Sequence, residues 1–458
     1  MKKYEYVIIG FGKGGKTLAG FLGNLGKKVA LIEKSNKMYG GTCINIGCIP
    51  TKTLVSKAKN SLIKNHSNFE DKAVEYKRAV KDKENLIEML RSKNYTMLDS
   101  NENIDIYNGE GAFESDRVIK VTNRNEEVRL EGENIFINTG SETIIPDIPG
   151  IINSSKIYTS TSIMNLTELP KELVIVGGGY IGLEFSSIYA SFGSKVTVIE
   201  TSDRIAGRED RDVADSIKEI LEKKGISFIL NAKVQEFKEE GNEVIVSYKD
   251  TSTGLDSKVK GDAILVATGR KPNISGLNLE AAGVKTTARG AVAVDNKLRT
   301  SVENIWAIGD VNGGPQFTYI SLDDFRIIKD HLFGDGKRSV DDRRFVPYSV
   351  FIEPNLSRVG LSSEEALKAG YDIKVAKLQV AAIPRARTIG EIEGMMKAVV
   401  DAKTNKILGC TILSAESSEL INIVSMAMKA DLEYTFIRDN IFTHPTMAEA
   451  LNDLFSMI

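Results

Sequence analysis

Short apolar runs alternate with glycine clusters and helix-like segments along the first part of the chain. The apolar run at residues 6–9 leads into Gly10, Gly12 and Gly15, then a helix-like segment, a second apolar run and Glu33. Strand, glycine-rich turn, helix and strand in this order predict a βαβ unit. The acidic residue follows the third glycine by 18 positions, close to the spacing found in βαβ units that bind a dinucleotide.

The same pattern returns 167 positions later. Gly177, Gly179 and Gly182 follow an apolar run, and Glu200 again comes 18 positions after the third glycine. Glycines in such a turn let the backbone approach a pyrophosphate at the helix N-terminus, and the carboxylate accepts hydrogen bonds from a ribose. One such motif means little in a chain with 39 glycines, but two in the same context predict two dinucleotide sites.

The later apolar runs extend both halves and then change character. Strands that end in Thr-Gly close at Gly140 and Gly269, and a further strand closes at Asp310. From about residue 346, strand-like stretches separated by turn residues precede helical stretches around 417–429 and 446–455. We therefore expect an α/β protein with two Rossmann-like dinucleotide-binding domains and a C-terminal α+β domain.

Composition narrows the function classes. The 458 residues are 42% hydrophobic and 27% charged, as in an ordinary globular protein, and a formal net charge of −2 does not indicate nucleic acid as a partner. No apolar stretch approaches the ~20 residues of a membrane span, and the first run is too short for a secretory signal. We expect a cytoplasmic protein, in which a disulfide is usually catalytic or redox-sensing.

Two of the three cysteines, Cys43 and Cys48, lie five positions apart in "GGTCINIGCIPTK". Residues five apart on an ideal helix have Cα atoms roughly 8 to 9 Å apart, whereas a disulfide needs less than about 7 Å. Gly47 therefore predicts a distorted turn that brings the thiols within bonding reach. A redox disulfide is favoured over buried free thiols and over a metal site, because no other cysteine or histidine has ligand-like spacing. Cys410 is interpreted as a core residue.

The cysteine loop, the two βαβ units, "WAIGD" and "HPTMAEALND" together resemble the flavoprotein disulfide reductases, which include glutathione reductase, lipoamide dehydrogenase and mercuric reductase. The resemblance runs from the first strand to the last helix and implies a glutathione-reductase-like fold. It implies an FAD-binding domain at 1–147, an NAD(P)H-binding domain at 148–270, a central domain completing the FAD site at 271–345 and a dimerisation domain at 346–458.

The resemblance also implies cofactor contacts. FAD lies in the first βαβ unit, with Glu33 on its adenosine ribose and Asp310 on its ribityl chain. NADH or NADPH lies in the second unit, with Tyr180 as the gate over the nicotinamide pocket. The other implied cofactor-binding residues, besides the six motif glycines and Glu200, are Gly41, Thr42, Lys52, Gly111, Ala112, Thr139, Gly140, Ser141, Thr318, Ile181 and Gly269.

The choice between NADH and NADPH depends on the end of the second βαβ unit. Glu200 accepts hydrogen bonds from an unphosphorylated ribose and repels a 2′-phosphate, so it favours NADH. Arg204 and Arg208 follow closely and soften that preference. We expect NADH to be preferred and NADPH to be tolerated.

The cysteines take different roles in the implied reaction. Reducing equivalents pass from NAD(P)H through the flavin to the disulfide; Cys48 rests against the flavin, and Cys43 attacks the substrate before Cys48 resolves the mixed species. Lys52 lies near the flavin and pairs with Glu184, where a cation supports the charge of reduced flavin.

His444 and Glu449 match the family's acid–base pair, which serves the active site of the other subunit and so implies a homodimer. His444 keeps Cys43 deprotonated and protonates the leaving group, while the carboxylate orients the ring. The alternative is that His444 merely caps a helix beginning near Thr446; beside a redox disulfide the acid–base role is favoured.

Several further stretches, among them "GFGKGGKTLA", "AIPRAR" and "FTHPTMAEALNDLF", resemble bacterial reactive-chlorine-resistance (RclA-type) flavoprotein reductases. This resemblance implies reduction of hypothiocyanous acid, with copper(II) reduction as a further possibility. Mercuric reductase is a poorer match, since the C-terminal "LNDLFSMI" has no cysteine pair. Two alternatives stay open: a reductase of a low-molecular-weight or protein disulfide, and a regulatory flavoprotein that only senses redox state. The acid–base pair argues against the sensor.

Overall fold

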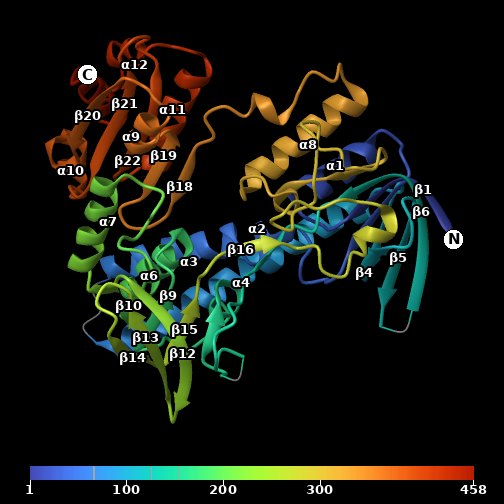
Figure 1. Ribbon diagram of the computed structural model, residues 1–458, viewed down its shortest axis with the longest axis horizontal. Coiled ribbons are helices and arrows are strands. Elements are labelled where there is room, and N and C mark those ends of the chain that lie inside the picture. The colour runs from blue at the N-terminus through green and yellow to red at the C-terminus, as the bar shows by residue number, and fades with distance from the viewer. Residues whose placement is uncertain (65–67, 125, 153) are drawn as a thin grey trace. The chain divides into compact units, whose positions relative to one another are not determined.

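The computed structural model describes residues 1–64, 68–124, 126–152 and 154–458. The chain forms two compact units, each assembled from segments that lie far apart in sequence (Figure 1). Unit 1 consists of Met1–Thr53, Val80–Ile145 and Gly269–Arg343; unit 2 consists of Leu54–Ala79, Pro146–Thr268 and Arg344–Ile458. Unit 1 therefore holds the first glycine motif and the cysteine loop, and unit 2 holds the second motif and the C-terminal segment.

A seven-stranded sheet forms the centre of unit 1. Strands β3, β2, β1, β6 and β17 are parallel neighbours, and β5 and β4 continue the sheet in antiparallel pairing. The strands are β1 (Lys2–Ile9), β2 (Val29–Glu33), β3 (Ile104–Asn108), β4 (Glu110–Phe113), β5 (Val118–Asn123), β6 (Glu126–Ile137) and β17 (Ile305–Ala307). Helix α1 (Lys13–Asn24) joins β1 to β2, so the first expected βαβ unit is confirmed.

The continuous apolar run of β1 reflects burial on both faces of the sheet. Ile8 packs in one hydrophobic core with Phe136, whereas Val7 and Ile9 pack in a second core with Ile135. A strand covered on both sides has no polar face, and parallel sheets are usually covered in this way. The helices of unit 1 also include α2 (Gly41–Asn45), α8 (Thr318–Phe333) and the later part of α4 (Phe69–Asp99).

Unit 2 repeats the parallel arrangement in the order β11-β10-β9-β15-β8. The strands are β8 (Ile157–Thr159), β9 (Glu172–Val176), β10 (Lys195–Ile199), β11 (Ile226–Ile229) and β15 (Ala263–Val266). Helix α6 (Tyr180–Phe192) connects β9 to β10 and completes the second βαβ unit, and α7 (Arg211–Lys223) connects β10 to β11. A separate antiparallel sheet is formed by β12 (Ala232–Glu240), β13 (Glu243–Asp250) and β14 (Asp256–Gly261).

The C-terminal part of unit 2 is an antiparallel sheet in the order β18-β19-β22-β21-β20. Its strands are β18 (Tyr348–Val350), β19 (Leu356–Gly360), β20 (Ile373–Gln379), β21 (Met395–Asp401) and β22 (Ile407–Leu413). Helices α9 (Ser363–Lys368), α10 (Pro384–Ile389), α11 (Ser417–Lys429), α12 (Tyr434–Arg438) and α13 (Ala450–Ser456) complete it. Cys410 on β22 is 1% exposed, so its interpretation as a core residue is confirmed.

The last helix begins later than the sequence predicts. We expected a helix from about residue 446, but α13 begins at Ala450, with Glu449 as its N-cap. The alternative role for His444, as the cap of a helix starting near Thr446, is therefore wrong.

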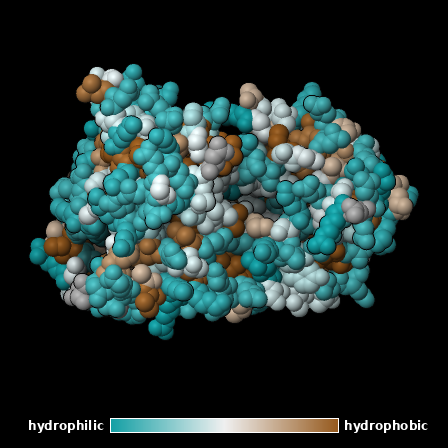
Figure 2. Space-filling model, turned by 90° about the horizontal axis from the view of Figure 1, so that it is seen from below, coloured by the Kyte–Doolittle hydropathy of each residue, from teal (hydrophilic) through white to brown (hydrophobic). Residues whose placement is uncertain are grey.

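The surface drawn in Figure 2 is mostly hydrophilic, with hydrophobic side chains in small groups among polar ones. Among the residues that the structure describes, no helix is both long and apolar enough to cross a bilayer.

The third glycine of the second motif gives a test of backbone packing. A Cβ at Gly182 would lie 1.9 Å from the carbonyl oxygen of Gly177, a backbone atom that cannot turn aside. We expect Gly182→Ala to lower the free energy of unfolding by about 1–3 kcal/mol, the usual range for overpacking. Thermal unfolding of Gly207→Ala is the matched control, because a Cβ at Gly207 meets nothing within 4 Å. Equal stability of both variants would contradict this prediction.

Candidate functional site

The cysteine loop begins with a close contact between two backbones. Gly40 and Gly41 have φ angles of 94° and 74°, which disfavour any residue with a Cβ. A Cβ at Gly41 would lie 2.6 Å from the Cα of Gly12, in the first glycine motif. The loop that carries the cysteines therefore lies directly against the first dinucleotide turn.

The distortion expected near Gly47 is present. Cys43 belongs to α2, Cys48 begins α3 (Cys48–Ile63), and Ile46 between them has left the helical conformation, with φ −141°. The two cysteines are thiols in this structure, so the disulfide itself stays a prediction.

The two thiols differ in pKa, because one donates a hydrogen bond to the other. A hydrogen bond from Cys43 lowers the pKa of Cys48 to about 6, and the hydroxyl of Thr318 and the charge of Lys52 act in the same direction. The Sγ of Cys48 lies 3.4 Å from Oγ1 of Thr318. The hydrogen bond to Cys48, together with burial, raises the pKa of Cys43 well above the ordinary thiol value. Cys48 is therefore the thiolate of the reduced pair, and Cys43 needs a base before it can act as a nucleophile.

Four polar side chains that the sequence did not single out, Asn45, Arg91, Lys16 and Asn94, form hydrogen bonds in or near this loop. Asn45 donates to the backbone oxygens of Tyr39 and Gly41 at 3.0 and 2.9 Å, and accepts from Nε of Arg91 at 2.8 Å. Lys16, which is 7% exposed, donates to Asn94, and burial lowers the pKa of this lysine to about 8. In the sequence, the signal for a buried lysine here was that Lys16 lies on the otherwise apolar face of the helix after the first glycine motif.

The first dinucleotide turn shows the features of a phosphate cradle. Gly10 has a φ of 107°, and a Cβ there would lie 2.4 Å from the backbone oxygen of Asn138. The amide of Asn138 also donates to the oxygen of Gly10 at 3.0 Å and would collide with a Cβ at Gly12 or Gly15. Backbone without side chains at the start of α1 fits the pyrophosphate of a dinucleotide.

Glu33 and Glu200 occupy equivalent positions in the two repeats. Glu33 accepts from the amides of Phe11 and Ser35 at 3.0 and 3.1 Å. Glu200 accepts from the amides of Gly178 and Ser202 at 2.7 and 2.9 Å. Each carboxylate is thus fixed at the end of a strand, beside the glycine turn, with acceptor capacity left for a ribose.

Asp310 lies just after β17 in unit 1. Its carboxylate accepts from Oγ of Ser141 at 2.7 Å, and Ser141 in turn accepts from Nε of Arg270 at 3.0 Å. The turn carrying Asp310 is held by the fully buried Asp324, whose carboxylate accepts from the amide of Gly309 at 2.6 Å.

The remaining predicted cofactor residues lie on turns that follow strands or on helices and strands. Thr139 donates to the backbone oxygen of Asn273 at 2.6 Å. Gly140 has a φ of 72° and Gly269 a φ of 116°. The others lie on β4 (Gly111, Ala112), α2 (Thr42) and α6 (Ile181).

His444 and Glu449, which the sequence predicts as an acid–base pair, lie within hydrogen-bond distance of each other. Nδ1 of His444 lies 2.8 Å from Oε2 of Glu449, with the histidine side chain 70% exposed and the glutamate 19% exposed. Glu184 is nearly buried and accepts from the amide of Phe351 at 2.8 Å. The predicted pairing of Lys52 with Glu184 stays a prediction. Within the described residues, no cluster of three or more His, Cys, Asp or Glu side chains is arranged to hold a metal.

Comparisons with known proteins agree with this geometry. Residues 4–324 match the family model of pyridine nucleotide-disulphide oxidoreductases, and residues 346–455 match the dimerisation domain of the same family. The chain is 50% identical to the probable pyridine nucleotide-disulfide oxidoreductase RclA of Escherichia coli, over 100% of both chains. It is 34% identical to a mercuric reductase of Staphylococcus aureus, over 98% of this chain and 81% of that protein.

A solved structure gives the same result. The Cu(II) complex of the HOCl-induced flavoprotein disulfide reductase RclA from Escherichia coli superimposes with a TM-score of 0.94, at 50% identity and over 100% of both chains.

The unequal thiols predict a pH dependence of alkylation. Below pH about 6 both cysteines are protonated, and above it one thiolate forms, so iodoacetamide labelling of the reduced pair rises through that pH. In Cys48→Ser, labelling of the remaining thiol requires a higher pH, nearer the ordinary value of about 8.5 or above. Peptide mass spectrometry measures both, with buried Cys410 as the unlabelled internal control. Labelling that begins only above pH 8 in the unaltered protein would contradict the lowered pKa of Cys48.

Proposed function

The chain belongs to the pyridine nucleotide-disulphide oxidoreductases, and we propose that it reduces hypothiocyanous acid with NADH through FAD and the Cys43–Cys48 pair. The observation that carries this proposal is the contact of Gly41 with Gly12, because it sets the redox pair beside the dinucleotide cradle. Full-length similarity to an HOCl-induced reductase supports an electrophilic oxidant as the substrate.

FAD fits the first cradle, and family membership implies use of a flavin and a pyridine nucleotide. The backbone of the turn at Gly10 and Gly12 would bind its pyrophosphate, Glu33 would hold its adenosine ribose, and Asp310 would hold its ribityl chain. Bound FAD supplies a two-electron relay between the nicotinamide and the disulfide.

The second cradle favours NADH. Glu200 is oriented by two backbone amides, so its negative charge stays beside the ribose. Arg204, the nearer candidate for binding a 2′-phosphate, already pairs with Glu364 at 3.3 Å. The proposed preference is NADH, with NADPH tolerated at higher concentration.

The proposed chemistry balances with the side chains of this protein. The imidazole of His444, oriented by Glu449, takes the proton of Cys43, whose raised pKa makes a base necessary. The Cys43 thiolate attacks the sulfur of hypothiocyanous acid, and the histidinium protonates the departing hydroxide to water. The Cys48 thiolate then attacks Sγ of Cys43 and expels thiocyanate, which leaves the disulfide. The two electrons lost by the thiols equal those gained by the substrate.

The family's dimerisation domain, matched at residues 346–455, supports a homodimer. We propose that His444 acts on the redox pair of the other subunit, and that the protein works in the cytoplasm, where its reduced nicotinamide substrate is available.

Copper(II) is the second candidate substrate, because the similar reductase has been solved as a Cu(II) complex. Reduction of a disulfide is the third, since the thiol pair is suited to exchange with any accessible sulfur electrophile. A redox sensor without turnover would have no use for the His444–Glu449 pair.

Anaerobic oxidation of NADH at 340 nm distinguishes these substrates. Hypothiocyanous acid, glutathione disulfide, lipoamide, copper(II) and mercuric ion are supplied separately to the FAD-loaded protein and to Cys43→Ser. We expect rapid turnover with hypothiocyanous acid alone, lost in Cys43→Ser because no nucleophile remains. Rapid turnover with a disulfide or a metal ion while hypothiocyanous acid is inert would overturn the substrate assignment.

The acid–base role predicts a loss confined to the oxidative half-reaction. His444→Gln should slow reoxidation of the reduced protein by about 10²–10⁴-fold, the usual contribution of a general acid–base group. Reduction of the bound flavin by NADH should stay unchanged, and stopped-flow absorbance measures both steps. His331→Gln, at the last turn of α8, is the control and should leave both rates unaltered. Equal slowing of both steps in His444→Gln would contradict the assignment.

A further inference from the structure

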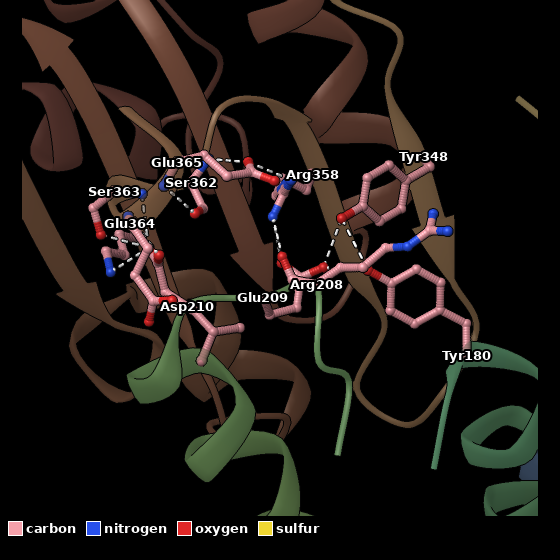
Figure 3. A network of polar contacts seen from close by, with 12 residues as sticks. Tyr180, Arg208, Glu209, Asp210, Tyr348, Arg358, Ser362, Ser363, Glu364 and Glu365 are labelled. Atoms are coloured by element: carbon pink, nitrogen blue, oxygen red, sulfur yellow. Dashed lines mark hydrogen bonds and ion pairs between the residues drawn. The ribbon is translucent and has the colours of Figure 1, made fainter. Parts of the chain in front are cut away.

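Tyr180, the first residue of α6, is held by a buried carboxylate that the sequence did not indicate. The hydroxyl of Tyr180 donates to Oε1 of Glu209 at 2.5 Å. The hydroxyl of Tyr348, at the start of β18, donates to the same oxygen at 2.6 Å. Figure 3 shows the two rings side by side with their hydroxyls directed to this carboxylate; the ring centroids are 5.5 Å apart. All of these residues belong to unit 2.

Glu209 has two side-chain partners besides Tyr180, namely Tyr348 and Arg358. Its side chain is 0% exposed, so an unpaired charge there would be strongly unfavourable. Tyr348 donates to one oxygen, and the guanidinium of Arg358 lies 3.5 Å from the other. Arg358 itself is fixed by the backbone oxygen of Arg208 at 2.7 Å and by Glu365 at 2.8 Å.

The hydroxyls of Tyr180 and Tyr348 also lie 3.0 Å apart, within hydrogen-bond distance, and either oxygen can be the donor. Because each hydroxyl has one proton, only two of the three contacts among the two phenols and Glu209 are hydrogen bonds at one time. Burial and the nearby carboxylate raise the pKa of both tyrosines, so both remain donors. A rotation of Tyr180 away from this position therefore breaks one hydrogen bond and leaves Glu209 with Tyr348 and Arg358.

We propose that Glu209 and Tyr348 are positioning residues that hold Tyr180 closed over the nicotinamide pocket, so that nucleotide binding must break the Tyr180–Glu209 hydrogen bond. The inference rests on the proposed function and on the role of Tyr180 as the nicotinamide gate, which the family resemblance implies. Loss of the Tyr180 hydroxyl frees the gate. Loss of the Tyr348 hydroxyl does the opposite, because Glu209 then depends more on Tyr180 and opening leaves it with Arg358 alone.

The two tyrosines therefore predict opposite changes in affinity. Apparent affinity scales with the fraction of molecules whose gate is open, and one hydrogen bond changes that fraction by about three- to tenfold. We expect Tyr180→Phe to bind NAD⁺ about three- to tenfold more tightly than the unaltered protein, and Tyr348→Phe to bind it weaker by a similar factor. Both changes keep the ring and remove only a hydroxyl.

Isothermal titration calorimetry with NAD⁺ and the oxidised, FAD-loaded protein measures this without turnover. In the double variant, Tyr348→Phe should have no further effect, because the bond it strengthens is already gone. Tyr371→Phe, at an exposed tyrosine in the same unit, is the control and should match the unaltered protein.

The outcomes separate the hypotheses. Tighter binding by Tyr180→Phe, weaker binding by Tyr348→Phe and a double variant that matches Tyr180→Phe support the proposal. Shifts in the same direction, shifts of the reverse sign, or none overturn the control of Tyr180 by Glu209 and leave the nicotinamide site intact. Failure of the unaltered protein to bind NAD⁺ overturns the nicotinamide assignment and this inference with it.

Discussion

The contact between the backbones of Gly41 and Gly12 is the constraint on which the rest of the site depends. Only residues without a Cβ permit it, because any Cβ at Gly41 would lie 2.6 Å from the Cα of Gly12. It holds the glycine turn at the start of α1 against the loop that carries Cys43 and Cys48. Asn45 stabilises the loop, because its side chain donates to the backbone oxygen of Gly41 and accepts from Arg91.

The surroundings of the two thiols differ, and so do their pKa values. Cys48 receives a hydrogen bond from Cys43, lies beside the Thr318 hydroxyl and feels the charge of Lys52, so it holds the negative charge of the reduced pair. Cys43, deprived of that stabilisation, keeps its proton. A reaction that begins at Cys43 therefore requires an external base, and the exposed His444–Glu449 pair has the chemistry of one.

The two dinucleotide turns use one device twice and then diverge. Glu33 and Glu200 accept hydrogen bonds from backbone amides at matching positions, so the two repeats agree even in these individual hydrogen bonds. Beyond that, the first turn is packed against the cysteine loop, whereas the second presents Tyr180 to Glu209.

The sequence by itself determined the two βαβ units, the cysteine loop with its distorted turn and the buried position of Cys410, because each depends on local spacing and local hydrophobicity. It misplaced the start of the last helix, since the hydroxyl of Thr446 accepts from the amide of Glu449 at 3.3 Å and a turn thus precedes the helix. Tertiary structure alone decided the contacts of Lys16 with Asn94 and of Glu209 with Tyr348, 78 and 139 positions apart. No local pattern records such pairs, because a polar side chain in sequence looks the same whether the fold gives it water or a buried partner.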